Sequence, residues 1–219
     1  MKTALIAGAT GLTGSQLLPL LLESDNYGNV IVLSRRPIKL DNSKAEIIVT
    51  DFNDLQTDLA GISIDDVFCC LGTTIKKAGS KDAFRQVDYQ YCLDLAEQCL
   101  ALGASHFLLI SALGASTKSL SFYSRTKGEL ERDLKSLNYP SLTILQPSLI
   151  DGDRSEERFG EEIALKLMKP LSAITQNLIP GITPVKASEI AACLYHCAAK
   201  PEQGFNVIKS DSIREIAAK

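Results

Sequence analysis

The sequence predicts an α/β protein whose mainly parallel, doubly wound sheet is covered by helices on both faces. Short runs rich in Val, Ile, Leu and Phe alternate along the chain with longer segments of helical periodicity, a pattern typical of this fold class. The runs show little polar alternation, as expected for strands that are buried on both faces. A glycine-rich turn also joins the first strand directly to the first helix.

The elements follow in chain order from these patterns. Strands are expected at residues 3–8, 29–34, 46–51, 66–71, 106–112, 142–148 and 205–209. Helices are expected at residues 12–24, 55–60, 80–102, 122–137, 159–170 and 187–199. Pro19 lies inside the first helix, where it removes a main-chain hydrogen bond and should kink or shorten that helix.

Residues 150–184 interrupt the alternation with a cluster of charges followed by prolines. In open α/β sheets ligands bind beyond the carboxyl ends of the strands, and this segment follows such an end. We therefore expect one domain over residues 1–219, in which 150–184 is a small C-terminal segment that covers the substrate. Arg154 and Arg158 either bind an acidic substrate or are ordinary surface charges.

Composition excludes several classes of partner. The formal net charge is -3, and no basic run exceeds two residues, so a nucleic-acid partner is not expected. No apolar stretch approaches the roughly 20 residues of a membrane span. The N-terminal residues also lack the layout of a secretory signal. These observations favour a cytoplasmic protein without membrane association, and they leave the oligomeric state open.

The six cysteines and two histidines lie in or beside apolar segments. Cys193, His196 and Cys197 come nearest to a ligand set, but no further Cys/His pair completes a metal site. We expect free, buried thiols, structural histidines and no metal.

Three closely spaced glycines follow the first strand. Such a turn allows main chain to approach a pyrophosphate, and the helix N-terminus adds N–H groups and a partial positive charge. We expect the pyrophosphate of a dinucleotide to be held by the turn residues Gly8, Thr10, Gly11, Leu12, Thr13 and Gly14.

The end of the second strand indicates which dinucleotide binds. Proteins that take the unphosphorylated cofactor usually have a carboxylate there, whereas this chain has Ser34, Arg35 and Arg36. Two guanidinium groups can hold a 2′-phosphate, so we expect NADP(H) in preference to NAD(H). The alternative is that both arginines are a solvated strand end.

Two further groups of residues are expected along the dinucleotide. Asp51 and Phe52, after the third strand, could line the adenine. Leu71, Gly72 and Thr73, after the fourth strand, would run along the middle of the cofactor.

A Ser/Tyr/Lys set follows the fifth strand. Ser111 stands at the strand end, and Tyr123 and Lys127 lie four residues apart on a predicted helix, hence on one face. A lysine ammonium favours the phenolate form of tyrosine, which makes tyrosine a usable proton donor or acceptor. Ser111 can hydrogen-bond the same substrate oxygen. We expect these three residues to be catalytic, the alternative being a retained but idle constellation.

The glycine turn, the Ser111/Tyr123/Lys127 set and Gln146-Pro147-Ser148 together resemble the short-chain dehydrogenase/reductase superfamily, in its atypical or extended branch. The segment from Cys69 to Thr74, with Lys77-Ala78-Gly79, is similar to the Tat-interacting-protein-like oxidoreductases. The resemblance covers nearly the whole chain.

The resemblance implies a Rossmann-like NADP(H)-binding fold and a role for each site residue. Tyr123 would be the general acid/base, Lys127 would bind the nicotinamide ribose and tune Tyr123, and Ser111 would polarise the substrate oxygen. Pro147 would lie beside the cofactor. Two departures stand out: Gln146 replaces an arginine found in many relatives, and Asp88 lies where many members use asparagine in a proton relay.

Three functions remain open from the sequence. The first is an NADP(H)-dependent oxidoreductase that acts on a small carbonyl or alcohol. The second is a non-catalytic NADPH-binding regulator or scaffold, which would have no need of the Tyr/Lys pair. The third is an epimerase or isomerase that retains its nucleotide.

Overall fold

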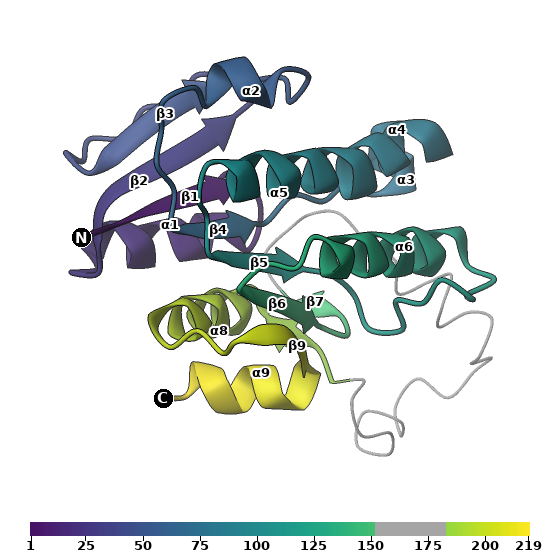
Figure 1. Ribbon diagram of the computed structural model, residues 1–219. Coiled ribbons are helices and arrows are strands. Elements are labelled where there is room, and N and C mark those ends of the chain that lie inside the picture. The colour runs from purple at the N-terminus through teal and green to yellow at the C-terminus, as the bar shows by residue number, and fades with distance from the viewer. Residues whose placement is uncertain (152–182) are drawn as a thin grey trace.

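The computed structural model describes residues 1–151 and 183–219 and confirms the predicted fold class. Seven strands form one sheet in the order β3-β2-β1-β4-β5-β6-β9, and every neighbouring pair is parallel (Figure 1). The strands are β1 (Lys2–Ala7), β2 (Tyr27–Ser34), β3 (Ala45–Val49), β4 (Asp66–Cys69), β5 (His106–Ile110), β6 (Ser141–Gln146) and β9 (Gly204–Lys209).

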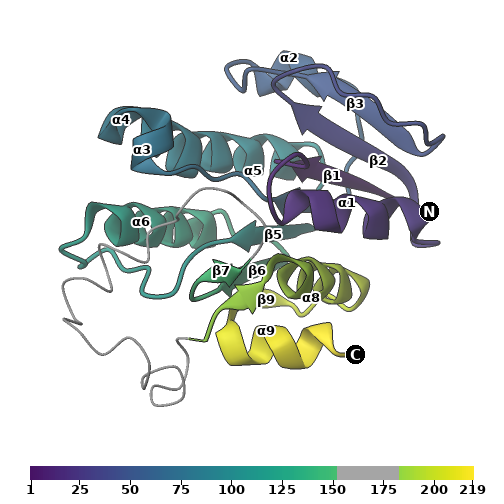
Figure 2. The same ribbon diagram turned by 180° about the vertical axis from the view of Figure 1, so that it is seen from behind.

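Helices cover both faces of this sheet, as Figures 1 and 2 show from opposite sides. One face carries α2 (Leu55–Asp58), α5 (Tyr91–Ala101) and α6 (Phe122–Ser136), and the other carries α1 (Gly14–Glu23), α8 (Ala187–Ala199) and α9 (Ser210–Ala217). Alternate side chains of each strand therefore enter two separate cores, which explains the continuous apolar runs.

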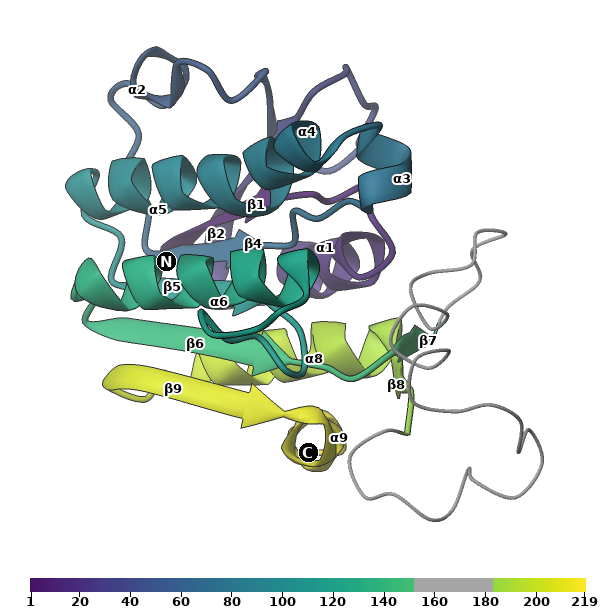
Figure 3. The ribbon, with the colours of Figure 1, turned by 90° about the vertical axis from the view of Figure 1, so that its right-hand side faces the viewer.

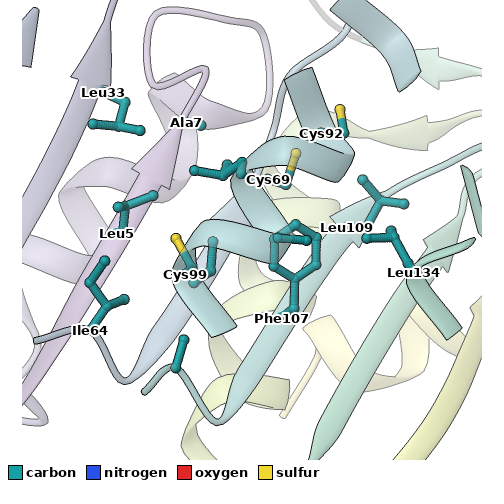
Figure 4. Close-up of a cluster of buried hydrophobic side chains, with 14 of the residues drawn as sticks. Leu5, Ala7, Leu33, Ile64, Cys69, Cys92, Cys99, Phe107, Leu109 and Leu134 are labelled. Atoms are coloured by element: carbon teal, nitrogen blue, oxygen red, sulfur yellow. The ribbon is translucent and has the colours of Figure 1, made fainter. Parts of the chain in front are cut away.

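Each core is made of side chains that the strand pattern alternates between the faces. On β1, Leu5 and Ala7 pack with the helices α2, α5 and α6, whereas Ala4 and Ile6 pack with α1 and α8. Figure 4 shows the first core, to which β5 contributes Phe107 and Leu109, and α5 contributes Cys92 and Cys99. All six cysteines are free thiols, as predicted, and four of them are buried, whereas Cys70 and Cys197 are only partly buried.

The structure departs from the predicted elements in several places. The helix expected at 80–102 is divided into α4 (Lys81–Arg85), the π-helix η1 (Gln86–Gln90) and α5. Four short elements were not expected: α3 (Ile75–Ala78), α9, and the paired strands β7 (Ile150–Asp151) and β8 (Val185–Lys186). α1 is shorter than predicted and contains Pro19. The helix expected at 159–170 lies outside the described residues, and the single domain over 1–219 stays a prediction.

All seven strands end at one edge of the sheet, because parallel strands share a direction; Figure 3 shows β4, β6 and β9 pointing the same way. The chain order reverses between β1 and β4, which lie side by side. At such a reversal the connections leave in opposite directions and open a crevice beyond the strand ends. The elements that follow β1, β4, β5 and β6 therefore meet there.

The start of β5 contains a buried imidazole. The Nε2 atom of His106 lies 2.9 Å from Oγ1 of Thr143, and its Nδ1 atom has no hydrogen-bond partner among the described residues. Burial, together with the positive charge of Lys2, lowers the pKa of His106 to about 4. The folded protein therefore keeps this imidazole neutral under conditions in which the unfolded chain binds a proton.

We expect acid to destabilise the protein through His106. Between the ordinary histidine pKa near 6.5 and the folded value of about 4 the unfolded state binds more protons, so the free energy of unfolding falls as the pH falls. Between about pH 7.5 and about pH 5 the free energy of unfolding should fall by about 2 kcal/mol through His106. Urea denaturation should be measured at both pH values. The free energy of unfolding of His106→Gln, whose side chain does not titrate, should fall by about 2 kcal/mol less than that of the wild type. Equal losses in the two proteins would contradict this account.

Candidate functional site

Two adjoining lobes of one cleft lie at the carboxyl edge of the sheet. The first, here the tyrosine lobe, has a volume of about 330 Å³ and is lined by Ser111, Tyr123 and Lys127. The second, here the arginine lobe, has a volume of about 410 Å³ and is lined by Arg35 and Phe52. Both lobes share the lining residues Gly11, Cys70, Leu71, Gly72 and Thr73.

The glycine turn forms the floor between the lobes. Gly8 has a φ of +88°, and a Cβ atom there would lie 2.5 Å from the carbonyl oxygen of Cys70. A Cβ atom on Gly14 would lie 2.1 Å from the carbonyl oxygen of Gly8, and the amide of Gly11 donates to that same oxygen at 2.9 Å. Any larger residue would push α1 away from β1, so the glycines set how closely main chain can approach a ligand.

This turn fits the pyrophosphate of a dinucleotide. Gly8, Thr10 and Gly11 line the arginine lobe, and Gly11, Leu12 and Thr13 line the tyrosine lobe, so the turn is exposed to both. Gly14 is buried at the start of α1, where the first N–H groups of a helix have no intrahelical acceptor. Both lobes thus adjoin the one turn whose main chain could hold an anion.

The arginine lobe is cationic. Arg35 lines it, as the sequence predicts, and Lys77 at the end of α3 lines it as well. No carboxylate lines this lobe among the residues that the structure describes. Lys77 is placed by Thr74, whose side-chain oxygen accepts from the Lys77 amide at 3.0 Å and caps α3. From the sequence, Lys77 was only part of a family resemblance, and no contact with the cofactor was predicted for it.

Phe52 occupies a constrained position on the wall of the arginine lobe. Its φ is +68°, and its ring stacks on Tyr91 with centroids 5.3 Å apart and planes inclined by 27°. Both rings line the lobe. They form a flat apolar wall of the kind that suits a planar base.

Besides the buried Gly14, two predicted cofactor residues line neither lobe. Arg36 is exposed, and its main chain takes part in a local turn with the hydroxyl of Ser34. Asp51 is exposed too, and it accepts from the amide of Asn53 at 2.9 Å. That hydrogen bond holds the pKa of Asp51 below its usual range. The structure thus brings Arg35 and Phe52 to the cleft, but not Arg36 and Asp51.

The tyrosine lobe gathers residues from three strand ends. Ser111 follows β5, and Pro147 follows β6. Three residues follow β4, namely Leu71, Gly72 and Thr73. Tyr123 and Lys127 of α6 line the same lobe. The Tyr123 ring packs on the buried Phe84 ring of α4, with centroids 5.6 Å apart. Every predicted catalytic residue therefore faces one cavity.

Lys127 is held by a buried ion pair. Its Nζ atom lies 2.8 Å from Oδ1 of Asp88 in η1, and both side chains are almost inaccessible to solvent. Oδ2 of Asp88 accepts from the amide of Thr73 at 2.7 Å. Burial alone would lower the pKa of Lys127, but Asp88, together with Tyr123 and Cys92, more than offsets it and the pKa is raised. Because Asp88 neutralises the ammonium, the field that Lys127 exerts at Tyr123 is weaker than that of the lone cation assumed from the sequence.

A second polar cluster, not foreseen from the sequence, lies behind Ser111. The Ser111 hydroxyl donates to Oε1 of Glu131, and Nε2 of Gln146 donates to both oxygens of Glu131 at 3.0 and 2.9 Å. Burial raises the pKa of Glu131, opposed by these hydrogen bonds and by Lys127. The spacing in the sequence could have indicated Glu131, because it follows Lys127 by four residues on α6 and therefore lies on the same helix face.

The two ends of the expected substrate cover are described. Ile150 and Asp151 of β7 pair with Val185 and Lys186 of β8, and Leu149, Ile150, Asp151 and Pro184 line the tyrosine lobe. The carbonyl of Thr183 accepts from the Ser148 hydroxyl at 2.8 Å and from Arg214 Nη2 at 2.6 Å. Arg154, Arg158 and the rest of 152–182 lie outside the described residues, so the cover itself stays a prediction.

A family model described as NAD(P)H-binding matches residues 8–163. Among curated relatives, the protein HTATIP2 of Rattus norvegicus is 35% identical over 192 residues, covering 85% of this chain and 79% of that protein. The protein FMP52, mitochondrial, of Meyerozyma guilliermondii is 32% identical over 200 residues, covering 90% of this chain and 86% of that protein.

Solved structures share the fold at low sequence identity. An oxidoreductase of the short chain dehydrogenase/reductase family from Burkholderia thailandensis superposes with a TM-score of 0.72 at 17% identity, covering 98% of this chain and 92% of that chain. A UDP-glucuronic acid 4-epimerase from Bacillus cereus in complex with NAD gives a TM-score of 0.67 at 18% identity, covering 95% and 77%. At these identities the likeness concerns the fold alone.

The prediction of a cytoplasmic location is wrong. It rested on finding no targeting or membrane signal in the sequence, whereas several FMP52 relatives are designated mitochondrial. Within residues 1–151 and 183–219, none of the helices has the length and apolar character needed to cross a bilayer.

We expect the Asp88–Lys127 pair to contribute strongly to stability. Asp88→Ala leaves a buried ammonium without its counter-charge, which should lower the free energy of unfolding by about 3 kcal/mol. Asp88→Asn should cost less, because its amide oxygen can still accept from Thr73. Urea denaturation measures both variants. Asp211→Ala, which removes an exposed ion pair with Arg214, serves as the control and should cost less than about 1 kcal/mol. An Asp88→Ala loss no larger than that of the control would refute the role of the pair.

Proposed function

The chain belongs to the NAD(P)H-binding family of Rossmann-type, atypical short-chain dehydrogenase/reductase-like proteins, and from this premise we propose that it is an NADP(H)-dependent oxidoreductase acting on a small carbonyl or alcohol. One observation carries the proposal: Ser111, Tyr123 and Lys127 line a single lobe that adjoins the glycine turn. A non-catalytic NADPH-binding regulator would need the turn but not the three side chains beyond it.

The arginine lobe supports the choice of NADP(H). A 2′-phosphate carries negative charge, and in this lobe it would meet the guanidinium of Arg35 and the ammonium of Lys77 with no carboxylate to repel it among the described lining residues. Arg35 provides a fork of N–H donors suited to phosphate, and Lys77 provides a compact cation. The adenine would lie against the wall made by Phe52 and Tyr91.

The tyrosine lobe supports acid–base chemistry at an oxygen atom. The bound nicotinamide would supply or accept the hydride. Tyr123 holds a proton at its phenolic oxygen and can pass it to, or take it from, the substrate oxygen. Lys127 stays charged through its pair with Asp88, so that it is a fixed cation in the lobe of the phenol and would hold the nicotinamide ribose there. Ser111 provides a second contact to the substrate oxygen.

We expect Tyr123→Phe to separate binding from chemistry. Removing the phenolic oxygen deletes the proton carrier, so NADPH-dependent turnover of a panel of small aldehydes and ketones should fall at least about 100-fold. NADPH affinity, measured by fluorescence titration, should change less than about twofold, because the ring remains. Tyr89→Phe is the matched control, since the Tyr89 hydroxyl donates to Asp133 and Tyr89 does not line either lobe. Unchanged turnover in Tyr123→Phe would remove the mechanism, and no turnover by the wild type would favour the regulator.

We expect the arginine lobe to set the preference for the phosphorylated cofactor. Arg35→Ala and Lys77→Ala should each weaken NADPH binding about 10-fold or more, the size of one lost charge-assisted hydrogen bond, and should change NADH binding less than about twofold. Parallel fluorescence titrations with both nucleotides measure this difference. Arg36→Ala is the control, because Arg36 is exposed and lies outside the lobe. Equal losses for NADPH and NADH would show that the lobe does not recognise the 2′-phosphate.

A further inference from the structure

Two opposite charges face the tyrosine lobe as one unit. Nζ of Lys127 lies 2.8 Å from Oδ1 of Asp88, and both residues line the lobe. Their side chains are 3% and 2% exposed, so little water screens either charge. Taken together, the ammonium and the carboxylate have no net charge. The lobe therefore contains a dipole where a lysine alone would present a buried cation.

The other charged residues near this pair contribute less to the lobe. Asp151 is the third charged residue among the described residues that line it, and Asp151 is exposed to solvent, which screens its field. Glu131 lies one turn from Lys127 on α6 but does not line the lobe. The cations of the arginine lobe do not line this lobe either. Among the described residues, the balance between Asp88 and Lys127 thus sets the buried charge of the tyrosine lobe.

The two redox forms of the proposed cofactor differ in charge at the reacting ring. The nicotinamide ring of NADP⁺ carries a formal positive charge, whereas the ring of NADPH carries none, and nearby charges act on this difference. The adenine, the pyrophosphate and the 2′-phosphate are the same in both forms. Their contacts with the glycine turn and the arginine lobe therefore cancel when the two affinities are compared, and the charge of the tyrosine lobe does not cancel.

We propose that Asp88 is a specificity-determining residue that lets the tyrosine lobe accept the cationic nicotinamide of the oxidised cofactor. By neutralising Lys127, Asp88 removes a buried positive charge that would repel the ring of NADP⁺ but not the ring of NADPH. This inference rests on the proposed function and deepens it, because it gives one residue control over which redox form binds. Oxidation of an alcohol begins from the oxidised cofactor, so Asp88 would keep that direction of the reaction open.

The main chain holds Asp88 in place independently of Lys127. Oδ2 of Asp88 accepts from the amide of Thr73 at 2.7 Å, and a Cβ atom on Gly72 would lie in ordinary contact, 3.6 Å from Oδ1. The carboxylate thus packs against the strand end that lines both lobes. The substitution Asp88→Asn keeps the shape of this side chain and removes its charge, whichever way the amide is turned. Lys127→Met likewise keeps an unbranched side chain and removes the ammonium.

The experiment measures the Kd of NADP⁺ and the Kd of NADPH by isothermal titration calorimetry at about pH 7.5, and compares their ratio, Kd(NADP⁺)/Kd(NADPH), between variants. Asp88→Asn leaves the ammonium without its counter-charge and should raise this ratio about fivefold. Lys127→Met leaves the carboxylate uncompensated and should lower the ratio about fivefold. The double variant Asp88→Asn/Lys127→Met has neither charge, and its ratio should lie within about twofold of the wild-type ratio.

Asp133→Asn is the matched control, because Asp133 pairs with the exposed Arg132 on α6 and lines neither lobe; it should leave the ratio unchanged. Far-UV circular dichroism establishes that each variant is folded. If Asp88→Asn does not fold, Lys127→Met and the double variant carry the test.

The direction of the two changes separates charge from structure. If both single variants weakened the two nucleotides by the same factor, or moved the ratio in the same direction, the inference would be overturned, because displaced contacts and not charge would explain the result. Binding with an unaltered ratio contradicts this inference alone and leaves the proposed function standing. A wild-type protein that binds neither nucleotide would overturn the proposed function and this inference with it.

Discussion

One ion pair connects three of the elements that line the tyrosine lobe. Asp88 of η1 contacts both Lys127 of α6 and the amide of Thr73 after β4, so a single carboxylate fixes the distance between two helical segments and a strand end. Both charges are almost fully buried, where an unpaired charge is costly. The π-helical turn in η1 lies at this carboxylate, as such turns frequently do at functional sites. The positions of Lys127 and, through α6, of Tyr123 and Glu131 depend on this pair.

Much of the fold could be predicted from the sequence, because buried parallel strands are apolar on both faces and the glycine turn has steric requirements that no other residue meets. The main sheet, the turn and the Ser111/Tyr123/Lys127 set follow from these local patterns. The short strands β7 and β8 could not be predicted, because two-residue pairings depend on segments brought together by the fold. The partners of Lys127 and Ser111 were hidden for the same reason: Asp88 is 39 residues from Lys127, and Glu131 is 20 residues from Ser111.

The cofactor residues illustrate the limit of neighbour-based reasoning. Arg35 and Arg36 are adjacent residues of one type, and Asp51 and Phe52 are adjacent residues after one strand, yet one member of each pair lines the arginine lobe and the other does not. Which member faces inward depends on the local turn, through the Ser34 hydroxyl in one case and the positive φ of Phe52 in the other. Lys77 reaches the same lobe from a helix after β4, and only the order of the strands brings that helix opposite Arg35.

The parallel pairing of β7 with β8 has an evolutionary consequence. Because Ile150 pairs with Val185, and because Ser148 and Arg214 both hold the carbonyl of Thr183, the described residues on either side of 152–182 are held together. The free energy of closing a loop grows only slowly with its length. Insertions, deletions or wholesale exchange between those fastened ends would therefore burden the rest of the molecule little. Sequence change between these ends would thus leave the main sheet and the glycine turn in place.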